Sequence, residues 1–360
     1  MQNYKIGLVP GPVEVPYKIR SAWVEEYGSA DIENEFFELY ALNQGLLRVL
    51  LKTHNDIVIT SGEAMSILWA SLKCTLKEGE KLLSVSSGLF GEGFADMGRA
   101  LGFESELVSF DYDDVPEPDK VYESVKKFRP KVITAVHCET PSGTINPYLK
   151  EIGEIAHKFD ALFIVDFVSS AGGVPLNVDE CNIDIGLLGS QKVLSMPSSL
   201  SITSISERAW EIIEQINYSG YEAFLPWREV PDKKFTPYTH DWYSMKALNY
   251  SLTSIFDEGL QNSWERHKES SEVCREMGRE IGLKLFPKKD SFSSPTVTAF
   301  YVPEKWSWKE FDDSLRSRGV VVGGNYGKLS GKVFRIGHMG SQAQTYKIKE
   351  AMTIISEILH

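Results

Sequence analysis

Between residues 56 and 205 the chain alternates short apolar runs with amphipathic segments of helix length. The apolar runs are rich in Val, Ile and Leu, which is typical of strands buried on both faces of a sheet. Strands are predicted at 57–60, 81–85, 107–109, 132–136, 162–165, 183–188 and 200–205, and helices at 64–76, 92–101, 121–127 and 149–157. This alternation predicts an α/β fold with a mostly parallel sheet sandwiched by helices. The pattern alone is compatible with any function.

The rhythm changes at residues 218–241, where proline, aromatic and charged residues crowd together. Long irregular segments inside a compact domain are usually functional. A helical stretch follows at about 244–284, and strand, helix, strand, strand and helix are then predicted at 296–302, 309–318, 320–322, 332–336 and 342–359. We therefore predict an N-terminal arm at 1–20, a large domain at 21–254 and a smaller C-terminal α/β domain at 255–360.

Composition narrows the class of partner. The 360 residues exceed one typical compact domain, and 42% hydrophobic and 24% charged residues are ordinary for a globular protein. The formal net charge of −12 argues against nucleic acid or an anionic membrane as the main partner, because both attract clustered Lys and Arg. The four cysteines form no C-x-x-C pair, and no apolar stretch reaches membrane-spanning length. These features predict a soluble, cytoplasmic protein with reduced thiols.

Two residues at predicted strand ends suit a pyridine cofactor. Asp166 follows the apolar run 162–165, at the edge where open α/β sheets bind ligands. Lys192 follows the next apolar run. A lysine that is partly desolvated there has a lowered pKa and a free amine for a covalent link to a carbonyl, while a carboxylate can keep a ring nitrogen protonated. Either residue, seen singly, is more often a surface group.

Two neighbouring segments offer further binding groups. Ser61, Gly62 and Glu63 follow a predicted strand and open a helix, so they either bind a phosphate or form an ordinary helix cap. Residues 87–91 follow the next strand, and their glycines let the backbone approach a ligand. Phe90 can lie flat on an aromatic ring, although an aromatic residue at a strand end usually belongs to the core.

Two further features concern metals and anions. His137 and Glu139 form a His-x-Glu pair, but the cysteine half of the zinc deaminase signature is absent, so we predict no metal site. Arg335 lies inside an otherwise apolar strand of the small domain. An inward arginine needs an anion, and a substrate carboxylate suits its two-pronged geometry. On an edge strand the same arginine would face solvent.

In this order, these pieces resemble the class V aminotransferases of pyridoxal 5′-phosphate (PLP) fold type I, and the resemblance covers essentially the whole chain. The similar segments are 9–12, 61–63, 87–91, 137–143, 165–170, 189–192, 258–260 and 334–340. Each segment is weak alone, and the ordered set is specific. The resemblance implies that Lys192 bonds PLP within the large domain.

The resemblance also implies a set of cofactor contacts. The backbone amides of Gly62 and Glu63 and the side chain of Gln191 would bind the phosphate. The ring would lie between Phe90 and Val168.

Other implied contacts concern the ring substituents and the subunit interface. Thr140 or Ser142 would hydrogen-bond the ring hydroxyl, and Asp166 would pair with the ring nitrogen. Thr236 and Thr239 are similar to a segment that reaches the phosphate of the neighbouring subunit, which implies a homodimer with shared sites.

Three branches of the family compete. Alanine–glyoxylate and serine–pyruvate aminotransferases resemble the run 322–340, and 2-aminoethylphosphonate–pyruvate aminotransferases resemble 235–240 and 294–301. Pyridoxamine–pyruvate aminotransferase resembles 61–63, 140–147 and 206–210, but Tyr326 occupies the position of its additional arginine. Cysteine desulfurases need a cysteine in the C-terminal half on a mobile loop, and none follows Cys274.

We therefore expect transamination from alanine or serine to glyoxylate or pyruvate. Arg335 would bind the carboxylate that these substrates share, with Gly11 and Tyr326 also at the substrate. A PLP-dependent lyase and a non-catalytic α/β binding protein are the competing hypotheses.

Overall fold

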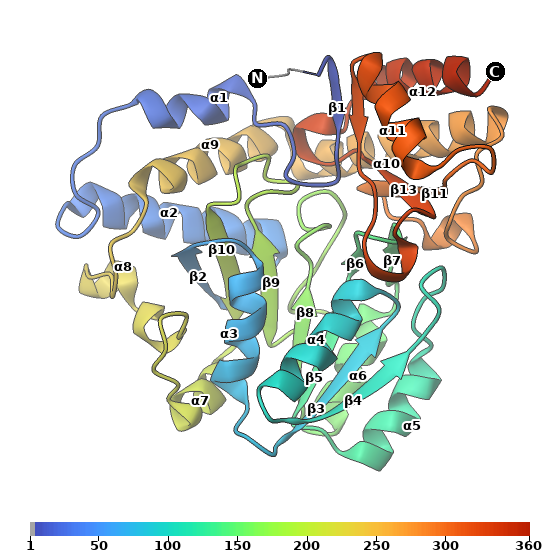
Figure 1. The fold of residues 1–360 in the computed structure, drawn as a ribbon. Coiled ribbons are helices and arrows are strands. Elements are labelled where there is room, and N and C mark those ends of the chain that lie inside the picture. Colours follow the sequence, from blue (N-terminus) through green and yellow to red (C-terminus); the bar gives the residue numbers. More distant parts are fainter. Residues whose placement is uncertain (1–3) are drawn as a thin grey trace.

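The central sheet of the large domain has seven strands in the order β2-β10-β9-β8-β5-β3-β4 (Figure 1). The computed structural model describes residues 4–360, so residues 1–3 of the predicted arm lie outside the described residues. The strands are β2 (Asp56–Ser61), β3 (Lys81–Ser86), β4 (Glu104–Ser109), β5 (Val132–Val136), β8 (Leu162–Asp166), β9 (Ile185–Gly189) and β10 (Leu200–Ile205).

The sheet is mostly parallel, which confirms the predicted fold class. Strands β9, β8, β5, β3 and β4 pair in parallel, whereas β10 runs antiparallel to both β9 and β2. Every residue of β5, β8 and β9 is buried, because helices cover both faces of the sheet. Each of the seven strands was expected from its apolar run.

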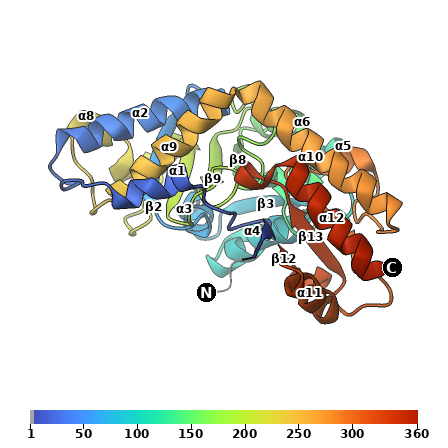
Figure 2. The same cartoon turned by 90° about the horizontal axis from the view of Figure 1, so that it is seen from above.

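A different pair of helices covers each face of the sheet. Helices α3 (Met65–Thr75) and α4 (Leu89–Ala100) lie on one face, and α5 (Pro118–Phe128) and α6 (Leu149–Lys158) lie on the other (Figures 1 and 2). This alternation follows from the right-handed crossovers that join parallel strands. Helix α7 (Glu207–Ile216) packs against α3.

Two helices frame the β2 side of the molecule. Helix α2 (Asn34–Leu51) packs against β2 and against α9 (Trp242–Glu258). The single helical stretch predicted at 244–284 is two helices, since Gly259 has φ +89° and ends α9 before α10 (Leu260–Glu280) begins. The short helix α1 (Tyr17–Arg20) lies on α9.

The small domain has its own core. It contains α10, β11 (Val297–Tyr301), α11 (Trp308–Ser317), β12 (Val320–Val322), β13 (Val333–Gly337) and α12 (Thr345–Leu359). Strand β1 (Ile6–Leu8) pairs in parallel with β12, so the N-terminal arm adds Ile6 and Leu8 to this core. Ser307 and Glu310 form a capping box that begins α11. The division of the chain near residue 255 stays a prediction.

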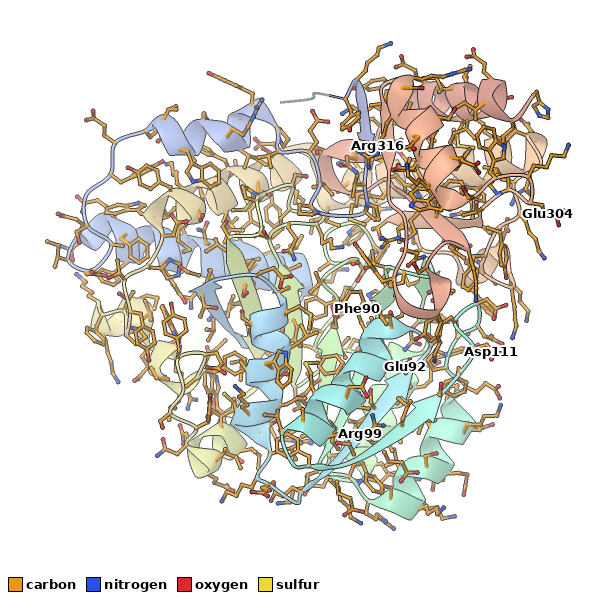
Figure 3. All side chains as sticks on the ribbon, viewed as in Figure 1. Phe90, Glu92, Arg99, Asp111, Glu304 and Arg316 are labelled. Carbon is orange, nitrogen blue, oxygen red and sulfur yellow. The ribbon has the colours of Figure 1, made fainter. Side chains whose placement is uncertain are left out.

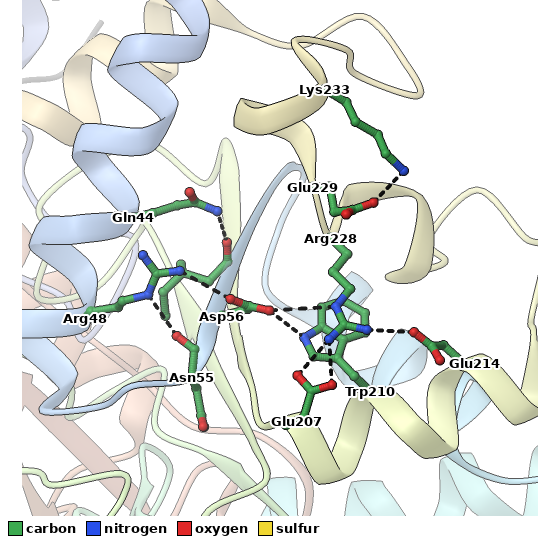
Figure 4. A network of polar contacts seen from close by, with 11 residues as sticks. Gln44, Arg48, Asn55, Asp56, Glu207, Trp210, Glu214, Arg228, Glu229 and Lys233 are labelled. Carbon is green, nitrogen blue, oxygen red and sulfur yellow. Dashed lines mark hydrogen bonds and ion pairs between the residues drawn. The ribbon is translucent and has the colours of Figure 1, made fainter.

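The irregular segment 218–241 is fastened to the large domain by Arg228 (Figure 4). The guanidinium of Arg228 forms ion pairs with Glu207 and Glu214 at 2.7 and 2.6 Å, and approaches Asp56 at 3.9 Å. It also lies over the ring of Trp210, whose Nε1 donates to Asp56 at 3.0 Å. One arginine thus ties this segment to α7 and to the start of β2.

Candidate active site

A cavity of about 300 Å³ opens at the carboxyl ends of β5, β8 and β9. Its lining residues come from seven separate segments of the chain. They are Gly11, Pro12, Glu63, Ala64, Met65, Leu68, Phe90, Thr140, Asp166, Val168, Ser169, Gln191, Lys192 and Ser198. Ligands of open α/β sheets bind at this edge, so the cavity lies where the strand order predicts it.

Lys192 projects from the loop after β9 into this cavity. Its Nζ donates to the carbonyl oxygen of Pro10 at 2.5 Å. Gly11 has φ +105°, and a Cβ there would come within 2.7 Å of the Lys192 side chain, so only glycine leaves room for the lysine. Burial, and then the positive charge of Arg335, lower the pKa of Lys192 to about 8. A substantial share of this amine is therefore neutral near physiological pH.

Asp166 is the last residue of β8 and is buried beside the same cavity. One carboxylate oxygen accepts a hydrogen bond from the Val168 backbone N–H at 2.8 Å. Burial raises the pKa of Asp166 to about 6, although the Val168 N–H and the charge of Lys192 oppose this shift. A cationic partner in the cavity would favour the ionised carboxylate.

Phe90, Val168 and Thr140 line the same cavity. The Thr140 hydroxyl hydrogen-bonds the Ser169 hydroxyl, and both residues line the cavity. Ser142 does not line it, because its hydroxyl pairs with Thr144 Oγ1 at 2.7 Å. Of the two alternatives for a ring-hydroxyl contact, the structure therefore brings only Thr140 to the cavity.

At the start of α3, the hydrogen bonds of Gly62 and Glu63 differ from those that the sequence interpretation expected. The Gly62 N–H donates to the carbonyl of Ser199 at 2.8 Å, so it is already engaged and does not face the cavity. The Glu63 carboxylate accepts from the Met65 N–H at 2.9 Å and from Gln191 Nε2 at 2.8 Å. A carboxylate thus takes the two donors that a phosphate would use. The hydroxyl of Ser61 is buried without a partner, outside the cavity lining.

Arg335 is buried in β13, which excludes the solvent-facing alternative. Its Nε and Nη2 donate to the carbonyl of Gly324 at 2.8 and 2.5 Å, and its guanidinium lies 5.1 Å from the ring centre of Tyr326. Neither Arg335 nor Tyr326 lines the cavity, although the Arg335 charge acts on Lys192. Binding of a carboxylate by Arg335 would therefore use the remaining nitrogen, Nη1.

Thr236 and Thr239 lie away from this cavity, against Asp31. Their hydroxyls donate to the two carboxylate oxygens of Asp31 at 3.3 and 3.2 Å. The predicted contact of these threonines with the cofactor phosphate of a neighbouring subunit involves a second chain, so it stays a prediction.

The sequence interpretation considered Glu139 only as part of a metal motif that it rejected. It is 2% exposed, and its two oxygens accept from the backbone N–H groups of Phe90 at 3.1 Å and Gly91 at 2.7 Å. Burial raises the pKa of Glu139 to about 8, the two N–H groups oppose this, and the Asp166 charge adds to it. A Cβ on Gly88 would come within 2.3 Å of the Glu139 side chain, so the space at Gly88 accommodates a carboxylate of the protein rather than a ligand.

The family model for class V aminotransferases matches residues 26–337. The chain belongs to the class V aminotransferases. Among residues 4–360 there is no group of three or more His, Cys, Asp or Glu side chains arranged to hold a metal ion. No helix in the same part of the chain is long and apolar enough to cross a membrane.

Relatives of this class V aminotransferase match it along nearly its whole length. An uncharacterized aminotransferase of Methanocaldococcus jannaschii is 35% identical over 346 residues, covering 93% of this chain and 88% of the relative. The alanine–glyoxylate aminotransferase of Callithrix jacchus is 29% identical, covering 98% and 86%. The crystal structure of pyridoxamine–pyruvate aminotransferase from Mesorhizobium loti superposes with a TM-score of 0.94 at 27% identity, covering 99% and 92%.

Membership of this family implies PLP as cofactor, and the cavity of this aminotransferase fits the pyridine ring. Phe90 and Val168 could pack against the two faces of the ring. The buried Asp166 carboxylate could pair with the ring nitrogen, and the Lys192 amine could bond the aldehyde carbon. Lys192 is the only Lys or Arg among the cavity-lining residues, so no further cationic side chain of residues 4–360 lines the cavity to bind a phosphate. Glu63 is exposed, so its carboxylate can turn outward and free its donors for a phosphate.

Proposed function

We propose that this enzyme is a PLP-dependent aminotransferase that moves the amino group of alanine or serine to glyoxylate or pyruvate. The single observation that carries the proposal is that the Lys192 amine, on the loop after β9, and the Asp166 carboxylate, at the end of the adjacent strand β8, line one cavity. The alanine– and serine–glyoxylate aminotransferases among its relatives support the proposed substrates.

The residues around the cavity have distinct tasks in this proposal. Bound PLP supplies an electron-withdrawing ring that weakens the Cα–H bond of the amino acid. Lys192 Nζ would take the Cα proton and return it as general acid–base, a role that suits an amine whose pKa burial lowers to about 8. Asp166 holds a proton at the ring nitrogen. Arg335 Nη1 binds the carboxylate common to both substrates.

A panel of donors and acceptors tests the proposal. Purified protein reconstituted with PLP is incubated with alanine, serine, 2-aminoethylphosphonate or pyridoxamine, each with pyruvate or glyoxylate, and the amino product is quantified. We expect alanine or serine to give glycine from glyoxylate, and a Lys192→Ala variant to give none. Ammonia release without amino transfer would instead indicate a lyase, and no turnover with any pair would refute the substrate assignment.

One observation favours a second candidate, a pyridoxamine–pyruvate aminotransferase. The Glu63 carboxylate lies where a phosphate would bind and uses the donors from Met65 and Gln191. An anion at this place disfavours a phosphate and tolerates the neutral hydroxymethyl group of pyridoxamine. Tyr326, in place of an additional arginine, argues the other way. Amino transfer from free pyridoxamine in the same panel would favour this candidate.

We also propose a homodimer with shared sites in the cytoplasm. The support for the dimer is the exposure of apolar side chains such as Val24 and Ile32. Ile32 adjoins Asp31, whose carboxylate the Thr236 and Thr239 hydroxyls contact. The support for a reducing compartment is that all four cysteines are unpaired.

A further inference from the structure

The first turn of α4 has no cap from its own neighbourhood. Gly88 precedes the helix and provides no side-chain hydrogen bond, although helices usually begin with a local Ser, Thr, Asp or Asn cap. The acceptor comes instead from Glu139, forty-nine positions beyond Phe90, on the short strand β6 (Cys138–Glu139). Its two oxygens accept from the N–H groups of Phe90 and Gly91.

A remote carboxylate is a costly way to cap a helix. Burying a carboxyl group is unfavourable unless hydrogen bonds compensate the loss of water, and a local side chain would satisfy the same N–H groups without that cost. A remote cap also fixes the position of the first turn of α4 relative to strand β6. Glu139 directly precedes Thr140, which lines the cavity, and it holds the backbone of Phe90, which lines the same cavity. Figure 3 shows Phe90 at the end of α4 that faces the small domain.

The first turn of α4 packs closely against Glu139 on one side and against the end of β3 on the other. Any side chain at Gly88 would overlap Glu139, and any side chain at Gly91 would come within 2.7 Å of Ser86 at the end of β3. The first turn of α4 is therefore pressed between β3 and Glu139. An amide in place of the carboxyl group has only one acceptor oxygen, so at least one of the N–H groups of Phe90 and Gly91 loses its acceptor, and the turn that carries Phe90 can then move.

We propose that Glu139 is a positioning residue of the cofactor site, whose carboxylate fixes Phe90 in the orientation in which its ring stacks on the cofactor. This inference rests on the proposed function, because the stacking partner is the pyridine ring. It assigns Glu139 no direct contact with cofactor or substrate, and its effect on binding is transmitted through Phe90.

The test compares Glu139→Gln with Asp184→Asn. Asp184 is also buried and accepts from a backbone N–H, that of Phe163 at 2.8 Å, but unlike Phe90, Phe163 does not line the cavity. Amide hydrogen exchange in the cofactor-free proteins reports on Phe90 and Gly91. Absorbance titration with PLP gives the dissociation constant of each variant. We expect Glu139→Gln alone to speed exchange at these two amides and to weaken PLP binding about tenfold.

A double-mutant cycle separates positioning from general damage. If Glu139 acts through Phe90, Glu139→Gln should weaken PLP binding much less in a Phe90→Leu background than in the parent. Additive effects of the two substitutions would overturn the proposal, as would an unchanged dissociation constant in Glu139→Gln or an equal loss in Asp184→Asn. If the parent binds neither PLP nor pyridoxal, the proposed function fails instead, while unchanged exchange at Phe90 and Gly91 would still refute the role of Glu139.

Discussion

The amine of Lys192 has a lowered pKa, so it becomes neutral and reactive at mildly alkaline pH. Its pKa of about 8 is well below that of an ordinary lysine, and only the neutral amine attacks a carbonyl. We therefore expect the rate at which cofactor-free protein combines with PLP to rise with pH and to level off above about pH 8. Stopped-flow absorbance at a series of pH values measures this midpoint.

Arg335 contributes to that low pKa, because its positive charge disfavours the protonated amine. Neutralising it in Arg335→Gln should move the midpoint to higher pH. Arg99→Gln, which removes an exposed arginine of α4 paired with Asp96, is the matched control and should leave the midpoint in place. A midpoint that stays near 8 in Arg335→Gln would contradict the electrostatic account.

Glu63 lines the end of the cavity where we propose that the cofactor phosphate binds. Replacing its carboxylate in Glu63→Gln removes a negative charge close to the phosphate, so PLP affinity should rise about tenfold while pyridoxal affinity changes little. Titrations of parent and variant with both compounds measure the difference. Glu92→Gln is the control, because this carboxylate is in the first turn of α4 but contacts Tyr112 and Lys328 rather than the cavity. Equal changes for both compounds would refute a role for Glu63 in phosphate discrimination.

At the scale of single residues, the sequence was informative where strand order alone determines proximity. Asp166 and Lys192 follow neighbouring parallel strands, so their side chains meet at one edge of the sheet. Glu139 could not be assigned in this way, because its partners are backbone amides of a helix far earlier in the chain. Engagement of the Gly62 N–H likewise depends on Ser199, which packs beside it only in the folded sheet.

Helix α4 contains glycines with opposite surroundings. Gly91 faces Ser86, whose Cα a new Cβ would approach to 2.8 Å, whereas a Cβ on Gly93 would meet nothing within 4 Å. We expect Gly91→Ala to lower the free energy of unfolding by about 1–3 kcal/mol. Gly93→Ala should raise it by about 0.5–1 kcal/mol, since alanine loses less backbone entropy in a helix. Urea unfolding of both variants measures the two effects, and similar values would contradict the packing of α4 on β3.

Elements were predicted best where one physical signal was strong. Buried strands are recognisable in the sequence as apolar runs, and these runs predicted all seven strands of the sheet. Helix α2 was not assigned, although its buried residues Phe36, Tyr40 and Leu47 recur at helical spacing. The break between α9 and α10 depends on one glycine, and Gly within a helical pattern is compatible with either continuation or an end.

At the scale of the whole molecule, exposed apolar side chains gather on the elements around α1, α2 and the segment before α9. Val24 and Ile32 are 81% and 74% exposed, and Ile32 adjoins Asp31, which the Thr236 and Thr239 hydroxyls contact. Figure 1 shows α1, α2 and α8 (Val230–Lys233) together at one side of the molecule, opposite the small domain. Such a face costs free energy in water unless a partner covers it. A second copy of this chain is the occupant that the predicted sharing of sites requires.

This proposal makes a combined prediction about assembly and cofactor binding. Light scattering should give the mass of two chains for the parent and of one chain for a Val24→Asp/Ile32→Asp variant, because two buried carboxylates would disfavour the interface. Tyr346→Asp, at an exposed aromatic residue of α12, is the matched control and should remain dimeric. If Thr236 and Thr239 contact the partner's phosphate, the dissociated variant should also bind PLP more weakly while pyridoxal binding changes less. A monomeric variant with full PLP affinity would contradict shared sites, and a monomeric parent would contradict the dimer itself.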